Sequence, residues 1–475
     1  MTSSLNLIVM AAGKGTRLKS DLPKVLHPLF GKSLLWRSLA SACELPVESA
    51  YVIVGHGRET VQAAMAKFSL PFNLTPIVQN PQLGTGHAVM QVQQAIGDKP
   101  LGTVVILSGD VPLLTPESLK SLVDLHHTQN HALTLLTTEL NNPTGYGRVI
   151  LAGETVQKIV EEKDASPEEK QVKTINTGIY CLDWQKVSPL LAKLNNNNAQ
   201  GEFYLTDLVA LSIAAKLSVG VACLEDSTES LGVNSRQDLA FCHQVLNNRS
   251  IDRLMSQGVT IVDPNQTTLG PEVLIGLDTV VHPGCVLTGN ITIGKGCTIG
   301  PHSVLNDQVA IGDRTQILHS WIKNAVIGPD NIVGPFAQIR DGAELTHHVR
   351  VGNFVEVKNT RIDHHSNAAH LSYLGDAEVG SDVNYGAGAI TANYDSIRDV
   401  KNKTVLEDGV KVSSNSVLVA PVIVGKDAFV AAGSVITNDV SPGDLAIARG
   451  RQADIAGWVT KAKEKAAEEK ALETT

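Results

Sequence analysis

Glycines and basic residues follow the first apolar run of the chain, in Gly13-Lys14-Gly15-Thr16-Arg17 and again at Lys24. Glycines allow backbone N–H groups to approach phosphate oxygens closely, and Arg17 and Lys24 add mobile positive charge. These residue types predict a loop for a triphosphate and its pyrophosphate leaving group. The segment matches neither the P-loop motif GxxxxGK[ST] nor the dinucleotide-binding motif GxGxxG. The alternative is a strand-to-helix turn with solvated basic residues.

A second motif begins with Gln79 and continues with Gly84 and Thr85 at the start of an expected helix. An amide side chain has both a donor and an acceptor, so Gln79 is suited to pair with the edge of a base. Gly84 and Thr85 would present backbone groups at the helix N-terminus. The alternative for Thr85 is simple helix capping.

Asp110 stands directly after an apolar strand, in Ser108-Gly109-Asp110-Val111-Pro112. Mg²⁺ in phosphate sites usually takes one or two protein oxygens together with phosphate oxygens, so Asp110 is a candidate ligand. Asn234 could supply the second oxygen, although the spacing of the two residues does not imply that they meet. The alternative is a turn aspartate before a proline.

Three more residues of the first half could bind a sugar: Gly147, Glu161 and Asn176. Glu161 and Asn176 could hydrogen-bond hydroxyl groups and an amide. Taken one at a time, each is more often structural.

In the second half, His370 is a candidate general base, because the pKa of histidine lies near neutral pH. Arg340 and Lys358 could hold a sugar phosphate. Four further histidines suggest a metal, but no cysteine or carboxylate completes a ligand set. They are His347, His348, His364 and His365.

Residues 1 to about 230 alternate short apolar runs with segments of helical period. Such alternation predicts βαβ units and a mainly parallel sheet, with ligands beyond the carboxyl ends of the strands. The expected strands are Leu5–Met10, Ala50–Val54, Pro76–Gln79, Val104–Leu107, Leu133–Thr137 and Thr177–Leu182. The expected helices are Lys32–Ala42, Glu59–Lys67, His87–Ile96 and Pro116–His126.

From residue 275 an aliphatic residue recurs every six positions, with a break of ten between Ile317 and Ile327. This period is typical of a left-handed parallel β-helix, in which three six-residue edges make one coil. An antiparallel β-domain would give spacings of two or of eight to twelve instead. The repeat is expected to break at 358–405. Its members are Ile275, Val281, Leu287, Ile293, Ile299, Leu305, Ile311, Ile317, then Ile327, Val333, Ile339, Leu345, Val351, Val357, and finally Leu406, Val412, Leu418, Val424, Val430 and Ile436.

The fold class expected from these patterns is an α/β Rossmann-like domain followed by a left-handed parallel β-helix. We place the first domain at 1–232, a linker helix at 233–258, the β-helix at 259–458 and a charged tail at 459–475.

The composition excludes several classes of protein. The chain has 475 residues and a formal charge of −9, which argues against a nucleic-acid-binding surface. Hydrophobic residues make up 43% and charged residues 18%, which excludes a disordered chain. The apolar run 7–12 is too short for a membrane span, and without a basic leader or a cleavage site it is not expected to be a signal peptide. Six cysteines without CxxC spacing predict buried free thiols in a reducing cytoplasm.

Several of these motifs occur together in one known family. The segment Ala11–Arg17 with Pro23-Lys24 resembles the signature of sugar-nucleotide pyrophosphorylases. Together with Gln82–His87, Asn195–Gly201 and the hexapeptide repeat, the chain resembles the bacterial bifunctional UDP-N-acetylglucosamine pyrophosphorylase/glucosamine-1-phosphate N-acetyltransferases, from about Leu7 to Trp458. This resemblance implies two consecutive activities that serve peptidoglycan and lipopolysaccharide synthesis: acetylation from acetyl-CoA first, then uridylylation from UTP.

For the first site, the resemblance implies that Arg17 and Lys24 are catalytic and stabilise charge on the UTP phosphates. It implies that Asp110 and Asn234 hold Mg²⁺. The residues that would bind UTP or UDP-N-acetylglucosamine are Ala11, Ala12, Gly13, Lys24, Gln79, Gly84, Thr85, Gly147, Glu161, Asn176 and Asn234.

For the second site, the resemblance implies that His370 takes a proton from the amine of glucosamine-1-phosphate. The residues that would bind this substrate are Arg340, Lys358, Tyr373 and Asn384. Those that would line the acetyl-CoA site are Ala387, Asn393, Tyr394, Ser414, Ala432 and Arg449. The family assembles as a homotrimer with a shared acetyltransfer site. Two alternatives stay open: a uridylyltransferase with a β-helix that serves only assembly, and a non-enzymatic regulatory subunit.

Overall fold

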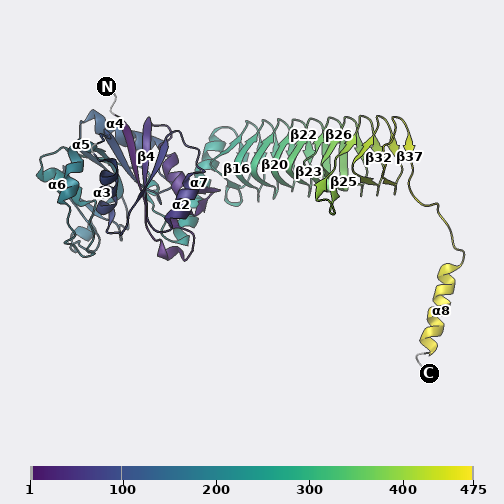
Figure 1. The fold of residues 1–475 in the computed structure, drawn as a ribbon, viewed down its shortest axis with the longest axis horizontal. Coiled ribbons are helices and arrows are strands. Elements are labelled where there is room, and N and C mark those ends of the chain that lie inside the picture. Colours follow the sequence, from purple (N-terminus) through teal and green to yellow (C-terminus); the bar gives the residue numbers. More distant parts are fainter. Residues whose placement is uncertain (1–3, 98, 154, 473–475) are drawn as a thin grey trace. The chain divides into compact units, whose positions relative to one another are not determined.

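The computed structural model describes residues 4–97, 99–153 and 155–472. The chain forms two compact units that meet in sequence between Ser250 and Ile251. Figure 1 shows a twisted sheet with helices in the first unit and a stack of coils in the second.

The first unit is built on a mixed sheet with the strand order β11-β7-β10-β6-β1-β4-β5. Neighbouring strands are parallel except β10, which runs antiparallel to both β6 and β7. The antiparallel β10 departs from the regular βαβ pattern. The strands are β1 (Leu5–Ala11), β4 (Val47–Val54), β5 (Asn73–Val78), β6 (Thr103–Ser108), β7 (Leu133–Glu139), β10 (Thr174–Asp183) and β11 (Val219–Cys223), with β8 (Arg148–Ala152) and β9 (Thr155–Val160) beside β10 and a separate pair β2 (Pro28–Leu29) and β3 (Lys32–Ser33).

Helices cover both faces of this sheet, and a hydrophobic core lies on each side. Along β1, Leu7 and Val9 face one core while Ile8 faces the other, so the strand is apolar throughout. Side chains from α1 (Leu34–Ala40), α2 (Arg58–Met65) and α4 (Pro116–Thr128) fill the first core. Side chains from α3 (Thr85–Ile96), α5 (Trp184–Val187) and α6 (Asp207–Ala214) fill the second. Each strand and helix expected in this half is present, with ends that differ by at most three residues.

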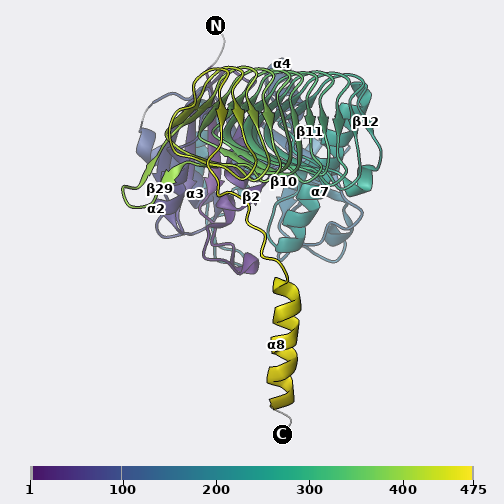
Figure 2. The same cartoon turned by 90° about the vertical axis from the view of Figure 1, so that its right-hand side faces the viewer.

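The second unit is a parallel β-helix of 24 strands in which strands pair with their counterparts in neighbouring coils. Figure 2 shows its coils almost superposed. The aliphatic repeat lies inside, as at Ile299 and Val412, which are fully buried. The strands are β12 (Thr260–Ile261), β13 (Thr268–Leu269), β14 (Val273–Ile275), β15 (Val280–Val281), β16 (Val286–Ile293), β17 (Thr298–Ile299), β18 (Val304–Ile311), β19 (Gln316–Ile317), β20 (Trp321–Ile327), β21 (Ile332–Val333), β22 (Gln338–Leu345), β23 (Arg350–Lys358), β24 (Arg361–Ile362), β25 (Asn367–Gly375), β26 (Ala377–Val379), β27 (Asn384–Tyr385), β28 (Ile390–Ala392), β31 (Thr404–Leu406), β32 (Lys411–Val412), β33 (Val417–Val419), β34 (Val422–Val424), β35 (Phe429–Val430), β36 (Val435–Ile436) and β37 (Leu445–Ala446).

The expected break at 358–405 is wrong for most of that segment, because the strand ladder continues from β24 to β28. Some edges contain five residues instead of six, and some interior positions hold residues that are not aliphatic, such as Tyr385 and Thr391. The interior positions here are Ile362, Ala368, Leu374, Val379, Tyr385 and Thr391, all buried. The one true interruption is the hairpin β29 (Tyr394–Asp395) and β30 (Val400–Lys401).

Two long helices and the cysteines complete the description. Helix α7 (Arg236–Ser256) contains the boundary between the two units, and helix α8 (Trp458–Leu472) is exposed along its whole length. The expectation of buried thiols is wrong for Cys223, which is exposed, while four of the six cysteines are buried. Among the helices of the described residues, none has both the length and the apolar character of a membrane span.

Candidate functional sites

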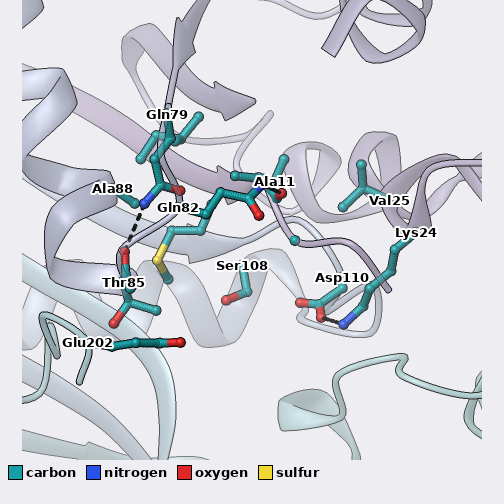
Figure 3. A pocket seen from close by; sticks show the side chains of 15 residues that line it. Ala11, Lys24, Val25, Gln79, Gln82, Thr85, Ala88, Ser108, Asp110 and Glu202 are labelled. Atoms are coloured by element: carbon teal, nitrogen blue, oxygen red, sulfur yellow. Dashed lines mark hydrogen bonds and ion pairs between the residues drawn. The ribbon is translucent and has the colours of Figure 1, made fainter. Parts of the chain in front are cut away.

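A cavity of about 350 Å³ opens at the carboxyl ends of β1, β4, β5 and β6 (Figure 3). Carboxyl ends of neighbouring parallel strands meet at one edge of a sheet, which is where α/β folds bind ligands. Its lining includes Ala11, Ala12, Gly13, Lys24, Gln79, Gly84, Thr85 and Asp110, all predicted from the sequence.

The glycine-rich loop leads from β1 into this cavity. Gly15 has a φ of +61°, and a Cβ added there would lie 2.5 Å from Cβ of Lys24, so a glycine is required for this close approach. Lys24 lines the cavity. Arg17 lies in a short 3₁₀ turn, Thr16–Leu18, is exposed and is not among the lining residues. The structure therefore brings Lys24, but not Arg17, to the site.

Lys24 connects the two predicted metal ligands. Its Nζ donates to Oδ1 of Asn234 at 2.6 Å and pairs with the carboxylate of Asp110 (Figure 3 shows the latter). Asp110 and Asn234 are 124 positions apart in sequence, yet their oxygens converge on one cation, the ammonium of Lys24. A carboxylate oxygen and an amide oxygen aimed at the same point are the donors that Mg²⁺ prefers, with substrate phosphates completing the shell. The residues present therefore fit this metal.

The buried side chain of Gln79 holds the loop that precedes α3. Its Nε2 donates to the carbonyl of Gly84 at 2.9 Å and lies 3.2 Å from Nδ1 of His87. Gly84 has a φ of +106°, and a Cβ there would lie 2.6 Å from the carbonyl oxygen of Phe203. Capping by Thr85 does not occur, because Gly84 is the N-cap of α3. The amide nitrogen of Gln79 thus already has hydrogen-bond partners within the protein.

Gly147, Glu161 and Asn176 form a second cluster. The carbonyl of Gly147 accepts from the backbone N–H of Asn176 at 2.9 Å, and a Cβ at Gly147 would lie 3.5 Å from both carboxylate oxygens of Glu161. Burial raises the pKa of Glu161 above its ordinary value, while a hydrogen bond from Thr206 at 3.2 Å opposes the rise. None of the three is among the residues that line the cavity.

Several lining residues were missed by the sequence analysis. Gln82 donates from its amide to the carbonyl of Ala12. Glu202 arrives on a loop that pairs with the motif before α3, through Phe203 N–H to the Leu83 carbonyl at 2.8 Å. No sequence signal links these two segments. Position at the end of a strand could have indicated Met10 and Ser108, whereas Val25 and Ala88 lie on helical turns. The missed residues are Met10, Val25, Ile53, Gln82, Ala88, Ser108 and Glu202.

In the β-helix, His370 is an exposed residue of β25. Its Nδ1 lies 2.9 Å from Oδ1 of Asn353 on β23, which is its register partner in the preceding coil. Asn353 was not among the predicted site residues. Three six-residue edges predict a coil of 18 residues, so the sequence period does not indicate this pairing, which has an offset of 17.

The predicted amino-sugar phosphate residues lie on the coil of His370, the two coils before it and the coil after it. Arg340 and Lys358 are register partners, so two basic side chains occupy adjacent positions. Arg340 is held by Glu356, to which it donates at 2.6 and 2.8 Å, and Tyr373 is the register partner of Glu356. Asn384 lies on β27 in the coil after β25.

The predicted acetyl-CoA residues lie in three places. Register pairs place Ala387, Ser414 and Ala432 at the same corner as His370 in successive coils. Small side chains thus form a row that leads away from His370. Asn393 and Tyr394 instead lie at the base of the β29–β30 hairpin, where Asn393 donates to Asp376. Arg449 follows β37 and is exposed.

Family models match three segments of the chain. A nucleotidyl transferase model matches residues 6–227, a GMPPB C-terminal domain model matches 269–373, and six bacterial transferase hexapeptide repeats match 403–438. The first covers the cavity and its glycine-rich loop. The third covers the end of the β-helix.

Curated relatives match along almost the whole chain. The bifunctional protein GlmU of Alkaliphilus metalliredigens is 43% identical over 96% of this chain and 98% of its own length. The protein of the same name from Cyanothece sp. is 45% identical over the same shares. Among solved structures, a UDP-glucose pyrophosphorylase complexed with UDP-glucose is 16% identical over 52% of this chain and 99% of its own, with a TM-score of 0.42.

Proposed function

The chain belongs to the family of the bifunctional GlmU proteins, and we propose that its two units act on the substrates that the resemblance of its sequence implies. It is an enzyme with a uridylyltransferase and an acetyltransferase activity, as the sequence analysis expected. We assign uridylyl transfer to residues 1–232 and acetyl transfer to 259–458, with 233–258 as linker and 459–475 as tail. The order is acetylation of glucosamine-1-phosphate, then uridylylation of N-acetylglucosamine-1-phosphate.

Uridylyl transfer takes place in the cavity, and the convergence of Lys24, Asp110 and Asn234 is the observation that carries this assignment. Asp110 and Asn234 would hold Mg²⁺, which supplies charge neutralisation for the phosphates when bound. Lys24 stabilises negative charge as a sugar phosphate oxygen attacks the α-phosphorus and pyrophosphate departs. Arg17 does not line the cavity, and its predicted catalytic role stays a prediction. Gln79, Gly84 and Thr85 form the wall that faces the uracil.

The sugar is bound by the cluster of Gly147, Glu161 and Asn176. The lack of a side chain at Gly147 leaves the Glu161 carboxylate open to a hydroxyl group. Gly178, two residues after Asn176, connects this cluster to the cavity, because a Cβ there would lie 3.9 Å from Oγ of Ser108.

Acetyl transfer takes place at His370, and the basic pair Arg340 and Lys358 lies in register with Gly375, five residues further along the strand of His370. The amine nitrogen of glucosamine-1-phosphate attacks the thioester carbonyl carbon of acetyl-CoA. The new C–N bond forms, the C–S bond breaks, and Nε2 of His370 takes the proton from the amine. That proton then passes to the departing sulfur, which leaves as the thiol of coenzyme A. Arg340, Lys358, Tyr373 and Asn384 hold the sugar phosphate.

We also propose that three copies of the chain assemble and complete the acetyltransfer site. An apolar ladder of Phe336, Phe354 and Leu371, 51%, 59% and 64% exposed, follows one corner of the β-helix next to His370. The rings of Phe336 and Phe354 are stacked with centroids 5.5 Å apart. Exposed apolar surface of this kind beside a site favours cover by a second copy. A reducing cytoplasm, which holds UTP and acetyl-CoA, suits the free thiols.

The test supplies the purified enzyme with glucosamine-1-phosphate, acetyl-CoA, UTP and Mg²⁺ and follows free thiol and pyrophosphate separately. We expect both products, with pyrophosphate release dependent on prior acetylation. If N-acetylglucosamine-1-phosphate yields pyrophosphate while glucosamine-1-phosphate never yields thiol, the β-helix serves assembly alone. If neither product appears in the folded protein, the regulatory alternative holds.

A further inference from the structure

Asn353 lies next to His370 on the adjacent rung of the β-helix. We propose that Asn353 is a positioning residue that holds the imidazole of His370 in the tautomer able to accept a proton at Nε2. This role rests on the proposed function of His370 as general base. The contact joins Oδ1 of Asn353 and Nδ1 of His370 at 2.9 Å.

The chemistry of the two groups fixes the direction of this hydrogen bond. An amide oxygen only accepts, so Nδ1 of His370 carries the proton and donates it. A neutral imidazole has one donor nitrogen and one acceptor nitrogen. Nε2 therefore has a free lone pair, which is the requirement for a base that removes a proton from an amine.

The backbone around Asn353 leaves it little freedom. A Cβ added at Gly352 would lie 1.9 Å from the carbonyl oxygen of Ala369, so the two coils approach each other as closely as a glycine allows. Asn353 itself is half-buried, while His370 is exposed. The orienting group is thus fixed by the fold, and the reacting nitrogen belongs to a ring that solvent and substrate can reach.

An amide orients the imidazole without adding charge. The neighbour of His370 in the following coil, Ala387, is also uncharged, and His370 forms no ion pair with any described residue. The charged groups on β23 are Arg350, Glu356, which Arg340 engages, and Lys358. A carboxylate in place of the amide would put a negative charge beside the imidazole and stabilise its protonated form, which cannot act as a base. Asparagine therefore keeps the base available.

The test compares Asn353→Ala and Asn353→Asp with a matched control, Asn306→Ala. Asn306 also accepts a hydrogen bond across neighbouring coils, from Oγ1 of Thr288 at 2.8 Å, but away from His370. All variants are measured as the full chain, for both activities and over a range of pH.

We expect Asn353→Ala to lower kcat for acetyl transfer about 10- to 100-fold, below the loss caused by His370→Ala, with little change in KM. Asn353→Asp keeps the acceptor, so it should restore much of kcat and move the acidic limb of the pH profile upward by about one unit. Uridylyl transfer should be unchanged in both, and Asn306→Ala should leave both activities as in the wild type.

Two results would overturn the positioning role. One is wild-type kcat in Asn353→Ala while His370→Ala is inactive. The base would then work equally well without its partner. The other is a loss in Asn353→Ala that appears in KM alone, together with an unmoved pH profile in Asn353→Asp. Retention of acetyl transfer by His370→Ala would instead remove the proposed base, and the role of Asn353 with it.

Discussion

The cavity of the first unit and the acetyltransfer site of the β-helix are assembled differently. Lys24, Asp110 and Asn234 come from three distant segments and meet because parallel strands end at one edge of a sheet. Asn353, His370 and Ala387 meet because they are one coil apart and each coil repeats the last. The first arrangement depends on the topology of the whole unit. The second depends only on register between neighbouring coils.

The largest effect should come from Asp110→Ala, which tests whether the two sites are independent. Loss of the carboxylate removes a proposed Mg²⁺ ligand and the partner of Lys24, so uridylyl transfer should fall about 1,000-fold or more. Acetyl transfer should stay near normal, as measured by thiol release. Asp124→Ala, on the exposed side of α4, is the control. Parallel loss of both activities in folded Asp110→Ala would contradict two separate sites.

An intermediate effect is expected from Ala387→Leu, which tests the row of small residues. A larger side chain one coil from His370 should obstruct the acetyl donor and raise KM for acetyl-CoA about 10-fold or more. KM for glucosamine-1-phosphate should change much less. Initial rates of thiol release at varied concentrations of each substrate give both constants. An equal rise in both would place the row outside the acetyl-CoA site.

The smallest effect concerns the pH dependence of sugar binding at Glu161. Burial raises the pKa of this carboxyl, and Asp164 and Asp207 add to the rise. The ionised form accepts a sugar hydroxyl, so KM for N-acetylglucosamine-1-phosphate should increase as the pH falls toward this raised pKa. Glu161→Gln should remove that dependence, whereas Glu139→Gln, on an exposed residue, should retain it.

The carboxyl of Glu161 also affects the stability of the fold, and here a low pH is favourable. A folded-state pKa above the unfolded value favours folding below the unfolded pKa, and this contribution disappears as the pH rises through the folded pKa. At neutral pH the buried charge therefore costs stability. Glu161→Gln should have a melting temperature at pH 7 no lower than that of the wild type. A clear decrease would show that the carboxylate is held by interactions stronger than its hydrogen bond from Thr206.

The comparison also explains what the sequence could predict. Apolar runs located the strands of the first unit, and a strict six-residue period located most of the β-helix. The period failed where edges shorten to five residues and where Tyr385 or Thr391 replaces an aliphatic residue, because the interior selects for volume at each level and not for one residue type. Asp110 could be predicted from its position after an apolar strand, whereas the place of Glu202 in the cavity and the convergence of Asp110 and Asn234 on Lys24 depend on the fold.

The row from His370 through Ala387 and Ser414 to Ala432 has a fixed spacing, which the stacking of the coils determines. Strands of neighbouring coils are about 4.8 Å apart, so the distance between any two residues of that row is set by the number of coils between them. The β29–β30 hairpin lengthens one interval to 27 residues instead of 17 without changing the register of the rungs on either side. Residues added at a corner therefore leave these distances unchanged. A whole coil added between His370 and Ala432 would lengthen the distance between them by about 4.8 Å, and with it the length of ligand that fits between the two.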